Sequence, residues 1–154
     1  LIDVKAVNKN GEVKTFTKNE LGLSYRKNLL TNDWFYLSAR FKSNSDNIDA
    51  IQKKMKAIMF KRKESQPTGV KTGGSTFMNM TNHKAWKLID ESGCRGIKHG
   101  EAQISEKHCN FIINTNKSSA TEIEELGEIV RNKVYKRTGK KLIWESWWNK
   151  GRIC

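Results

Sequence analysis

The 154-residue sequence lacks the features that mark membrane, secreted and metal-binding proteins. It contains one Pro, and no apolar run approaches the roughly 18 residues that would suggest a membrane helix. No secretory signal pattern stands at its N-terminus. Its three Cys lie far apart without CxxC spacing, so neither a disulfide framework nor a zinc site is predicted. We expect free thiols at Cys94, Cys109 and Cys154, no metal ion, no membrane partner and a cytoplasmic location.

Acidic residues are scarce relative to basic ones. There are 16 Asp and Glu against 29 Lys and Arg, which gives a formal net charge of +13. A basic surface can bind nucleic acid, anionic lipid or a small anionic ligand such as a diphosphate. The basic residues are spread along the whole chain, and their one local concentration, between Lys53 and Lys63, favours a solvated helix face. Composition alone therefore leaves all three classes of partner open.

Common nucleotide-binding and nucleophile motifs are absent. The segment Gly69–Ser75 reads GVKTGGS and has Gly where a Walker loop requires Lys, and no GxGxxG fingerprint occurs. Ser75 is followed by Thr76 and Phe77, so no GxSxG elbow is formed. By spacing alone, Ser75 is a serine on a flexible glycine-rich turn, which suits a connector as well as a catalytic site.

The first half of the chain predicts antiparallel strands and one helix. Residues 2–16 alternate apolar and polar positions around Asn10-Gly11, which predicts a hairpin. Residues 19–28 predict a loop, and the aromatic run 34–41 predicts a third strand. Asp46 is expected to cap a helix that ends near Glu64. Its apolar face would consist of Ile48, Ile51, Met55, Ile58 and Met59.

The second half predicts alternating helices and strands after a glycine-rich boundary at 67–75. A short helix is expected over 84–92, and a strand covered on both faces over 109–115. A helix is expected from a capping box to about Arg137, and a last strand over 142–145. The capping box would pair Thr121 with Glu124, and Gly139 would end the same helix. In the short helix over 84–92, the residues expected to pack inward are Ala85, Trp86, Leu88 and Ile89.

Four stretches carry a resemblance to a known family. They read ELGLSYR at 20–26, GGSTFMN at 73–79, AWKLIDESG at 85–93 and GEAQISEKHCNFIIN at 100–114. In order and separation they resemble the C-terminal half of UDP-N-acetylenolpyruvoylglucosamine reductase, also called UDP-N-acetylmuramate dehydrogenase. The resemblance implies an α+β fold in two parts. Residues 1–65 would be the C-terminal part of an FAD-binding domain, and residues 66–154 a small α+β substrate-binding domain.

The resemblance also implies an activity. NADPH reduces a bound FAD, and the enolpyruvyl double bond of a UDP-sugar is then reduced to give UDP-N-acetylmuramate for peptidoglycan synthesis. The family's glycine-rich FAD-binding segments lie upstream of Leu1, so this chain, which does not begin with Met, is expected to be a fragment that is colourless on its own. A non-catalytic basic domain that binds UDP-sugar, or another polyanion such as nucleic acid, is the alternative. Nucleic acid is not an expected partner of the reductase.

The resemblance assigns roles to individual residues. Ser75 matches the proton donor, and Arg26 and Glu145 match residues around the substrate carboxylate, where a guanidinium fork suits that charge. Glu101 stands where a glycine is usual, so its side chain is expected to obstruct a backbone conformation or a close approach that glycine permits. The remaining assignments are Asn79, Lys63 and His108 to the substrate, with the first two near its diphosphate, and Tyr25 and Gly74 to the flavin.

Overall fold

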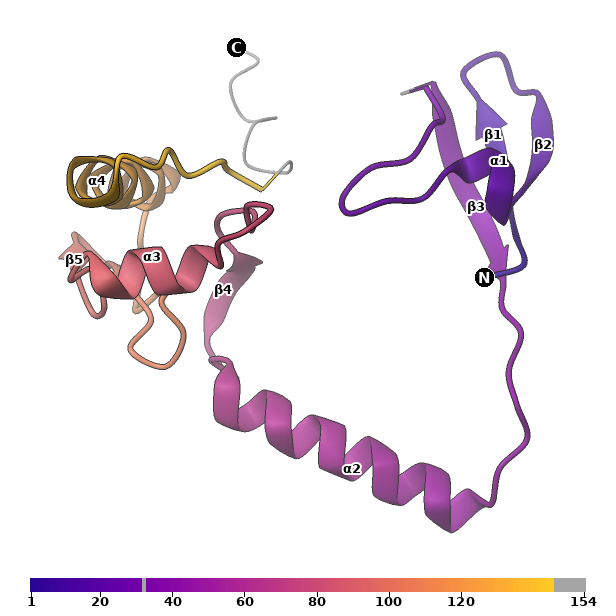
Figure 1. The fold of residues 1–154 in the computed structure, drawn as a ribbon, viewed down its shortest axis with the longest axis horizontal. Helices are drawn as coiled ribbons and strands as arrows, with labels where there is room; N and C mark the ends of the chain where they lie inside the picture. Colours follow the sequence, from indigo (N-terminus) through magenta and orange to yellow (C-terminus); the bar gives the residue numbers. More distant parts are fainter. Residues whose placement is uncertain (32, 146–154) are drawn as a thin grey trace. The chain divides into compact units, whose positions relative to one another are not determined.

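The computed structural model describes residues 1–31 and 33–145. Its strands form a three-stranded and a four-stranded antiparallel sheet, and helices accompany both (Figure 1). The predicted α+β class is confirmed. Contacts divide the chain into unit 1, Leu1–Ile51, and unit 2, Gln52–Cys154. The domain boundary predicted at residues 65/66 stays a prediction.

Unit 1 is built on the predicted hairpin. Strands β1 (Asp3–Asn8) and β2 (Val13–Thr17) pair across a turn in which Gly11 has φ +83°, and β3 (Trp34–Arg40) pairs with the other edge of β1. The predicted loop begins instead with a short helix, α1 (Lys18–Leu21). The N–H of Glu20 donates to the Thr17 side chain and the Glu20 carboxylate accepts from Thr17, so a capping box starts this helix.

The core of unit 1 is small. The side chains of Arg40 and Asp3 form an ion pair, with Nε of Arg40 2.8 Å from Oδ1 of Asp3, and this pair joins β3 to the start of β1. Several large apolar residues of β3 remain more than half exposed, among them Phe35 and Tyr36. The buried apolar side chains are Val4, Ala6, Phe16 and Leu21, with Leu1, Leu30 and Trp34 packed against them.

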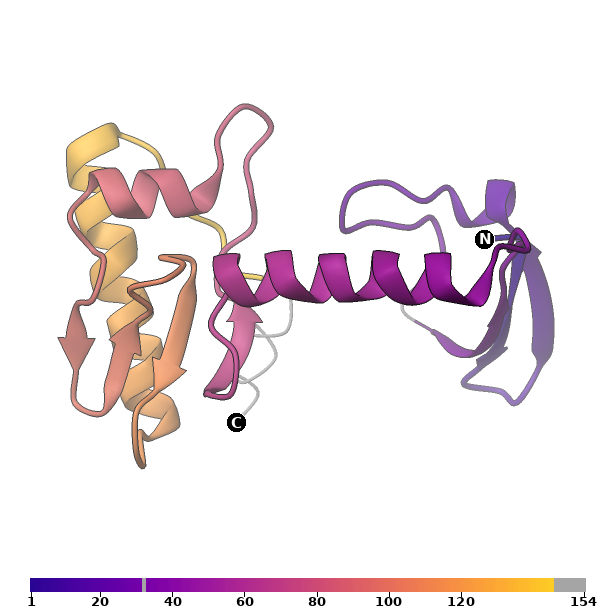
Figure 2. The same cartoon turned by 90° about the horizontal axis from the view of Figure 1, so that it is seen from below.

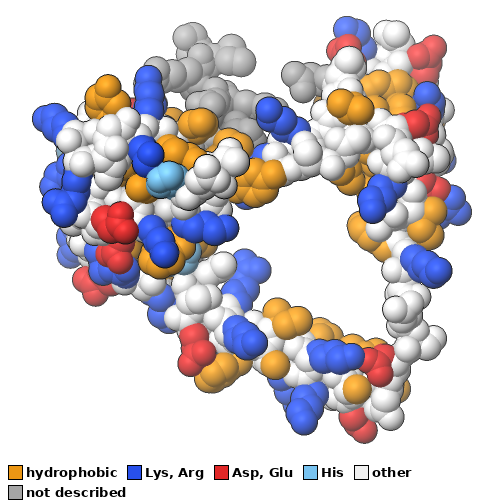
Figure 3. Space-filling view, viewed as in Figure 1, with side chains coloured by type: hydrophobic (Ala, Val, Ile, Leu, Met, Phe, Trp, Pro, Cys, Tyr) orange, Lys and Arg blue, Asp and Glu red, His pale blue; other side chains and the backbone are white. Residues whose placement is uncertain are grey.

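Helix α2 (Ile48–Ser65) runs close to its predicted limits. Asn47, rather than Asp46, accepts the hydrogen bond from the N–H of Asp49, at 2.8 Å, and its carbonyl accepts the first helical bond. None of its residues is buried, and Ile48 and Met59 of the predicted apolar face are 72% and 66% exposed. Lys and Arg side chains line the same helix beside these apolar groups (Figure 3).

Unit 2 contains a sheet in the order β4-β7-β6-β5. In Figure 2, α4 crosses one side of these strands and α3 lies next to it. Apolar side chains from both helices and from β6 and β7 make the core: Ala85, Leu88, Ile89, Ala102, Ile104, Ile112, Leu126, Val130 and Val134. The elements are β4 (Lys71–Ser75), α3 (Ala85–Glu91), β5 (Lys98–His99), β6 (Ala102–Ile104), β7 (Phe111–Asn114) and α4 (Ala120–Thr138).

Helices α3 and α4 correct two predictions. The capping box of α4 consists of Ser119 and Glu122, two residues before the predicted pair, although Gly139 ends the helix as predicted with φ +69°. Trp86 is 37% exposed, because residues 85, 88 and 89 share one face of α3 and residue 86 lies off that face. The predicted last strand is present as an isolated bridge between Phe77 and Trp144.

The turn between β5 and β6 shows how Glu101 is accommodated. Gly100, with φ +54°, takes the position of this two-residue turn that needs a positive φ, and Glu101 does not. A Cβ at Gly100 would lie 1.7 Å from Oε1 of Glu122. The glycine requirement of the backbone therefore falls on residue 100, so Glu101 obstructs no backbone conformation here. Its obstruction of a close approach stays a prediction.

The structure also bears on the Cys thiols, on metal-binding groups and on membrane-spanning helices. Cys94 and Cys109 are free, as predicted, and both are buried, while Cys154 lies outside the described residues. Desolvation raises the pKa of Cys109 to about 11. Within residues 1–31 and 33–145, no group of three or more His, Cys, Asp or Glu could hold a metal ion. No described helix is both long and apolar enough to cross a bilayer.

We expect Gly127→Ala to destabilise the protein. Alanine at an interior helix position ordinarily stabilises by up to about 1 kcal/mol. Here the added Cβ would lie 2.0 Å from Cη2 of Trp144, so the indole must move, and we expect a loss of about 1–3 kcal/mol in the free energy of unfolding. Urea unfolding measures this change. Asn132→Ala, at an exposed position of the same helix, should be neutral or stabilising.

Candidate active site

A β-bulge in β4 determines which way Ser75 faces. Thr72 pairs with Ile113 and Ser75 with Phe111, so β4 carries one extra residue between these two pairs. Gly74, with φ +86°, lies inside the bulge. In a regular ladder Gly74 would stand opposite Phe111 and Ser75 would face the other side of the sheet.

The bulge turns Ser75 away from the helices. Residues directly opposite in an antiparallel pair have their side chains on the same face, so Ser75 and Phe111 share a face. The next residue of β7, Ile112, packs in the core on the side of α3 and α4. Because alternate residues of a strand face opposite sides, Phe111 and the partly exposed Ser75 lie on the face away from the helices.

Asn110 holds the chain directly after Ser75. Its side-chain oxygen accepts from the N–H of Phe77 at 3.0 Å, and its side-chain nitrogen donates to the carbonyl of Phe77 at 2.8 Å. Its own carbonyl accepts from the N–H of Thr76, at 2.8 Å. Asn110 is buried, so these bonds satisfy backbone groups that water does not reach. The Asn110 side chain thus provides the hydrogen bonds that the backbone of a neighbouring strand would otherwise make to Phe77.

Glu145 lies beside the same segment. Its N–H donates to the carbonyl of Thr76, the residue after Ser75, at 3.0 Å. Its side chain is buried, with 5% of the residue exposed. The preceding residue, Trp144, is anchored on both sides: its Nε1 donates to Glu128 at 2.9 Å, and its ring centroid lies 4.9 Å from that of Phe77. The structure therefore brings the backbones that carry Ser75 and Glu145 together.

His108 lies partly buried next to β7. Its ring Nδ1 accepts from the backbone N–H of Asn110 at 3.3 Å, and its backbone N–H donates to the Oγ of Ser105. Desolvation lowers the pKa of His108, and the positive charge of Arg95 lowers it further. Its ring lies edge-on to that of Phe111, with the centroids 4.8 Å apart. The proton of the neutral ring is therefore on Nε2, which can donate.

Lys63 and Asn79 also belong to unit 2. The carbonyl of Lys63, in the last turn of α2, accepts from the Nζ of Lys107 at 2.9 Å, which connects this helix to the loop that carries His108. The side-chain oxygen of Asn79 accepts from the N–H of Ala85 at 3.0 Å and so caps α3. Asn79 thus has a structural role that the sequence did not predict.

Tyr25 and Arg26 form the tip of a tight turn in unit 1. The N–H groups of Ser24 and Lys27 each donate to the carbonyl of the other, at 3.0 and 3.2 Å. Arg26 has φ +59°, a left-handed conformation that is costly for a residue with a Cβ, and such strain clusters at functional sites. Its guanidinium carbon lies 5.7 Å from the centroid of the Tyr25 ring. Convergence of Arg26 with Ser75 stays a prediction, because each unit is described by itself.

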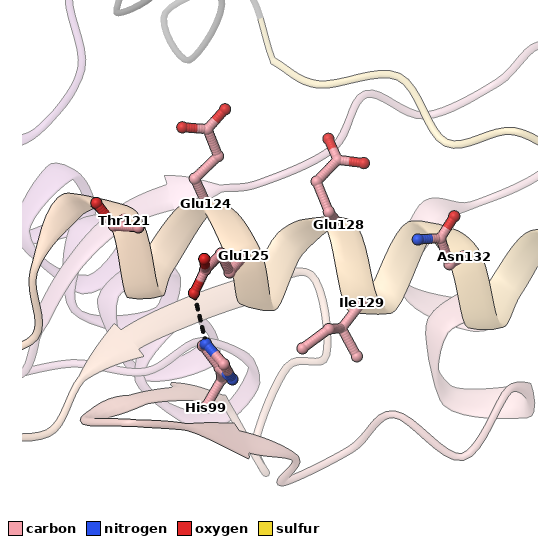
Figure 4. Close-up of a pocket in the computed structure, with 7 residues that line it drawn as sticks. All are labelled: His99, Thr121, Glu124, Glu125, Glu128, Ile129 and Asn132. Carbon is pink, nitrogen blue, oxygen red and sulfur yellow. Dashed lines mark hydrogen bonds and ion pairs between the residues drawn. The ribbon is translucent and has the colours of Figure 1, made fainter.

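A groove along α4 is a poor match to the predicted ligand. Figure 4 shows Glu125 of α4 pointing to His99, with 2.7 Å between Oε2 and Nε2, while Glu124 and Glu128 also line the groove. These carboxylates would repel a diphosphate. None of the predicted site residues lines it. The residues around this groove are His99, Thr121, Glu124, Glu125, Glu128, Ile129 and Asn132.

Residues 66–148, more than half of the chain, match the family model for the C-terminal domain of UDP-N-acetylenolpyruvoylglucosamine reductase. The chain belongs to this reductase family. It is 45% identical over 144 residues to the reductase of Paramagnetospirillum magneticum and 47% identical over 145 residues to that of Novosphingobium aromaticivorans. These matches cover 94% of the chain but 47% and 49% of the two relatives. The chain thus spans about half the length of the curated relatives it matches.

A solved reductase structure agrees with the sequence match. The crystal structure of the enzyme from Thermus caldophilus is similar to this chain with a TM-score of 0.79 and 31% identity. The similarity covers 94% of the chain and 52% of the Thermus caldophilus chain. In this member of the family, unit 2 carries Ser75, Glu145, His108, Lys63 and Asn79, whereas unit 1 carries Tyr25 and Arg26.

Sequence reasoning missed Asn110, which supports the segment that carries Ser75. Its contacts run to backbone atoms 33 positions away, which no local pattern reveals. The available signal was a polar residue at the entrance of an apolar strand, between Cys109 and Phe111. A buried amide at such a place needs partners, and it finds them in the segment that carries Ser75.

We expect Gly74→Ala to weaken both the fold and ligand binding. No atom lies within 4 Å of a Cβ built at Gly74, so the cost is conformational and about 1–2 kcal/mol, because its φ is +86°. Relief of that strain would change the bulge and turn Ser75. Gly69→Ala is the matched control, since Gly69 also has a positive φ and open space but lies outside β4. Urea unfolding should show similar losses for both variants, and only Gly74→Ala should also weaken UDP-sugar binding.

Proposed function

We propose that this chain supplies the substrate-binding and proton-donating part of a reductase that forms UDP-N-acetylmuramate for peptidoglycan synthesis. The substrate would be UDP-N-acetylglucosamine enolpyruvate, and FAD and NADPH the cofactors. The observation that carries the proposal is the bulge that directs Ser75 away from the helices, on a segment hydrogen-bonded to the backbone of Glu145. The expected cytoplasmic location remains a prediction.

Two residues, one in each unit, would suit a flavin. A Cβ at Gly74 would have no atom within 4 Å, so a flat ring can approach the backbone at this glycine. The ring of Tyr25 is more than half exposed and offers a stacking or hydrogen-bonding group. We assign Gly74 and Tyr25 to this role. When bound, FAD supplies the hydride that adds to the enolpyruvyl double bond.

The chain's own residues would provide the proton and hold the substrate. The Ser75 hydroxyl would donate its proton to the alkene carbon that bears the carboxylate. A serine is a weak acid, so the resulting alkoxide needs nearby positive groups or hydrogen bonds. Arg26 would bind the substrate carboxylate in a bidentate manner and oppose the negative charge that develops there. Buried Glu145 would orient the reacting group beside Ser75.

The diphosphate would bind near the loop of His108. Lys63 presents an ammonium group at the end of α2, whose backbone is tied to that loop through Lys107. A lysine acts as a flexible point charge towards phosphate. Asn79 caps α3 and holds its amide near the start of that helix. These placements support the assignment of Lys63, Asn79 and His108 to the substrate.

The net charge of +13 and the exposed lysines of α2 favour a second candidate, a non-catalytic domain that binds a polyanion. Nucleic-acid binding would weaken steeply as salt rises, because bound cations are released from the phosphates. Binding in a shaped diphosphate site would instead discriminate among UDP-sugars. Titration of the chain with a single-stranded oligonucleotide and with UDP-sugars at two salt concentrations separates these candidates.

The reductase proposal is tested by reconstitution. The chain would be mixed with a separate polypeptide that carries the half of the Paramagnetospirillum magneticum reductase outside the match, together with FAD and NADPH. We expect NADPH oxidation that requires both polypeptides and UDP-N-acetylglucosamine enolpyruvate, whereas the chain alone should be colourless and inactive. If the substrate is omitted, oxidation should stop. A mixture that retains flavin but never consumes NADPH with this substrate would contradict the proposal.

A further inference from the structure

The segment that carries Glu145 lies against residues 76–78 and is bonded to them through the backbone. The N–H of Met78 donates to the carbonyl of Ile143 at 2.8 Å, and the N–H of Glu145 donates to the carbonyl of Thr76 at 3.0 Å. This contact spans a few residues, and so short a pair of strands is marginally stable without further packing. Contacts from outside the pair are therefore needed to keep Glu145 in one place.

Helix α4 supplies such contacts through Glu128 and Arg131, which we call the α4 pair. The Glu128 carboxylate accepts from Nε1 of Trp144 at 2.9 Å. Nε of Arg131 donates to the carbonyl of Leu142 at 3.1 Å. The two α4 residues also contact each other, with 2.5 and 2.7 Å between Nη1 of Arg131 and the two carboxylate oxygens of Glu128. The α4 pair therefore contacts the chain at two points shortly before Glu145.

The indole of Trp144 rests on the backbone of α4. A Cβ built at Gly127 would lie 2.0 Å from Cη2 of this ring, so the absence of a side chain there makes room for the indole. The centroid of the ring lies 4.9 Å from that of Phe77. These packing contacts do not select a direction for the indole N–H, whereas a hydrogen bond does. The bond to Glu128 thus determines how the ring is turned.

The α4 pair is partly shielded from water, since the side chain of Arg131 is 21% exposed and that of Glu128 37%. Exposed ion pairs ordinarily contribute little to stability, so the attraction between these two charges is not the main effect. Each of them makes a second bond, one to the indole N–H and the other to a carbonyl. Hydrogen bonds to charged groups are shorter and stronger than neutral ones. The α4 pair therefore ties the segment 142–145 to α4.

We propose that Glu128 and Arg131 are positioning residues that hold Glu145 in its place beside Ser75. The inference rests on the proposed function and extends it by naming what fixes the segment that carries Glu145. The α4 pair would act through this segment and would not touch the substrate. A displacement of about 1 Å at a reacting group can cost roughly 10²-fold in rate. The effect of the α4 pair should therefore appear in kcat more than in KM.

The first test is hydrogen exchange in the 154-residue chain, measured by NMR at the N–H groups of Glu145 and Met78. We expect Glu128→Ala to speed exchange at both groups about tenfold, because a lost bond to a charged group favours local opening. Glu128→Gln keeps an oxygen that accepts from the indole, so its exchange should rise less than about threefold. Glu125→Ala is the control and should change neither group. It removes the same charge from α4, but its carboxylate contacts His99.

The second test is turnover of the reconstituted reductase. Glu128→Ala should lower kcat about 10–100-fold and leave KM for the UDP-sugar within about twofold, whereas Glu128→Gln should recover most of the loss. Arg131→Met should resemble Glu128→Ala, and Arg137→Met, at an exposed position of α4, should equal the unmodified chain. In a Glu145→Ala background, adding Glu128→Ala should change kcat less than about twofold, because the α4 pair acts through Glu145.

Four outcomes would overturn the positioning role. Unchanged exchange at Glu145 in Glu128→Ala would show that the α4 pair does not hold this segment. An equal loss of kcat in Glu128→Gln and Glu128→Ala would remove the indole bond from the account. A full further loss in the Glu145→Ala background would show action elsewhere, and full activity of Glu145→Ala would leave nothing to position. Hydrogen exchange needs neither flavin nor substrate, so failure of the reductase proposal, seen as no turnover by the unmodified mixture, is recognised separately.

Discussion

Ser75→Ala should lower turnover of the reconstituted reductase by about 10²–10⁴-fold, which is the usual contribution of a positioned general acid. Binding of UDP should stay within about twofold of the unmodified chain, because the substitution removes one partly exposed hydroxyl and leaves the bulge and the Phe111 pairing in place. Stopped-flow and steady-state measurements of NADPH consumption give the turnover, and calorimetry gives the affinity for UDP.

The matched control for Ser75→Ala is Ser43→Ala, which removes a hydroxyl from an exposed position between β3 and α2. We expect turnover and UDP affinity of this control to equal those of the unmodified chain. Full activity of Ser75→Ala would remove the proton-donor role. A loss of UDP affinity as large as the loss of turnover would give Ser75 a binding role instead.

Asn110→Leu should lower the free energy of unfolding of the chain by about 2–4 kcal/mol. The substitution leaves the N–H and carbonyl of Phe77 without their side-chain partners in a buried place, and each unsatisfied group costs about 1–3 kcal/mol. Leucine has a similar volume, so the loss reflects hydrogen bonds more than packing. Thermal and urea unfolding measure it, and a fall of roughly 4–16 °C in Tm is expected.

The same substitution should affect the chemistry more than the exposed control Asn116→Leu. Asn110 holds the segment that carries Ser75, and the same segment accepts a hydrogen bond from the backbone of Glu145. Asn110→Leu should therefore lower kcat even under conditions where the variant is folded. Asn116→Leu should change neither Tm nor kcat, because its side chain is exposed. An Asn110→Leu variant with unchanged stability would mean that the two hydrogen bonds to Phe77 contribute little.

Local patterns were sufficient for several elements. Asn10-Gly11 supplies the backbone angles of the first turn, and the hairpin around it is present. The spacing of Leu126, Val130 and Val134 predicts α4, and all three residues are buried. Gly139 ends that helix in the left-handed conformation that glycine favours. In each case the deciding interactions lie within a few residues of one another.

Other elements depended on distant partners. The glycine-rich segment before Ser75 has no strand-like pattern, yet β4 forms there because β7 pairs with it and the bulge accepts an extra residue. The short strands β5 and β6 likewise depend on pairing within the sheet. Two serine or threonine capping boxes fit the start of α4, and the upstream Ser119 is the one used. Resemblance, rather than spacing, predicts the role of Ser75, and neither drew attention to Asn110.

Helix α2 has a practical consequence. It spans 18 residues, has no buried side chain, and contains Lys53, Lys54, Lys56, Lys61, Arg62 and Lys63. Isolated helices of this length are marginally stable in water, so the segment opens often and presents many bonds that trypsin cleaves. Limited digestion should therefore cut within α2 first and release the four-stranded unit as a resistant product. A partner that covers the apolar side of α2 would be detected as protection from the protease.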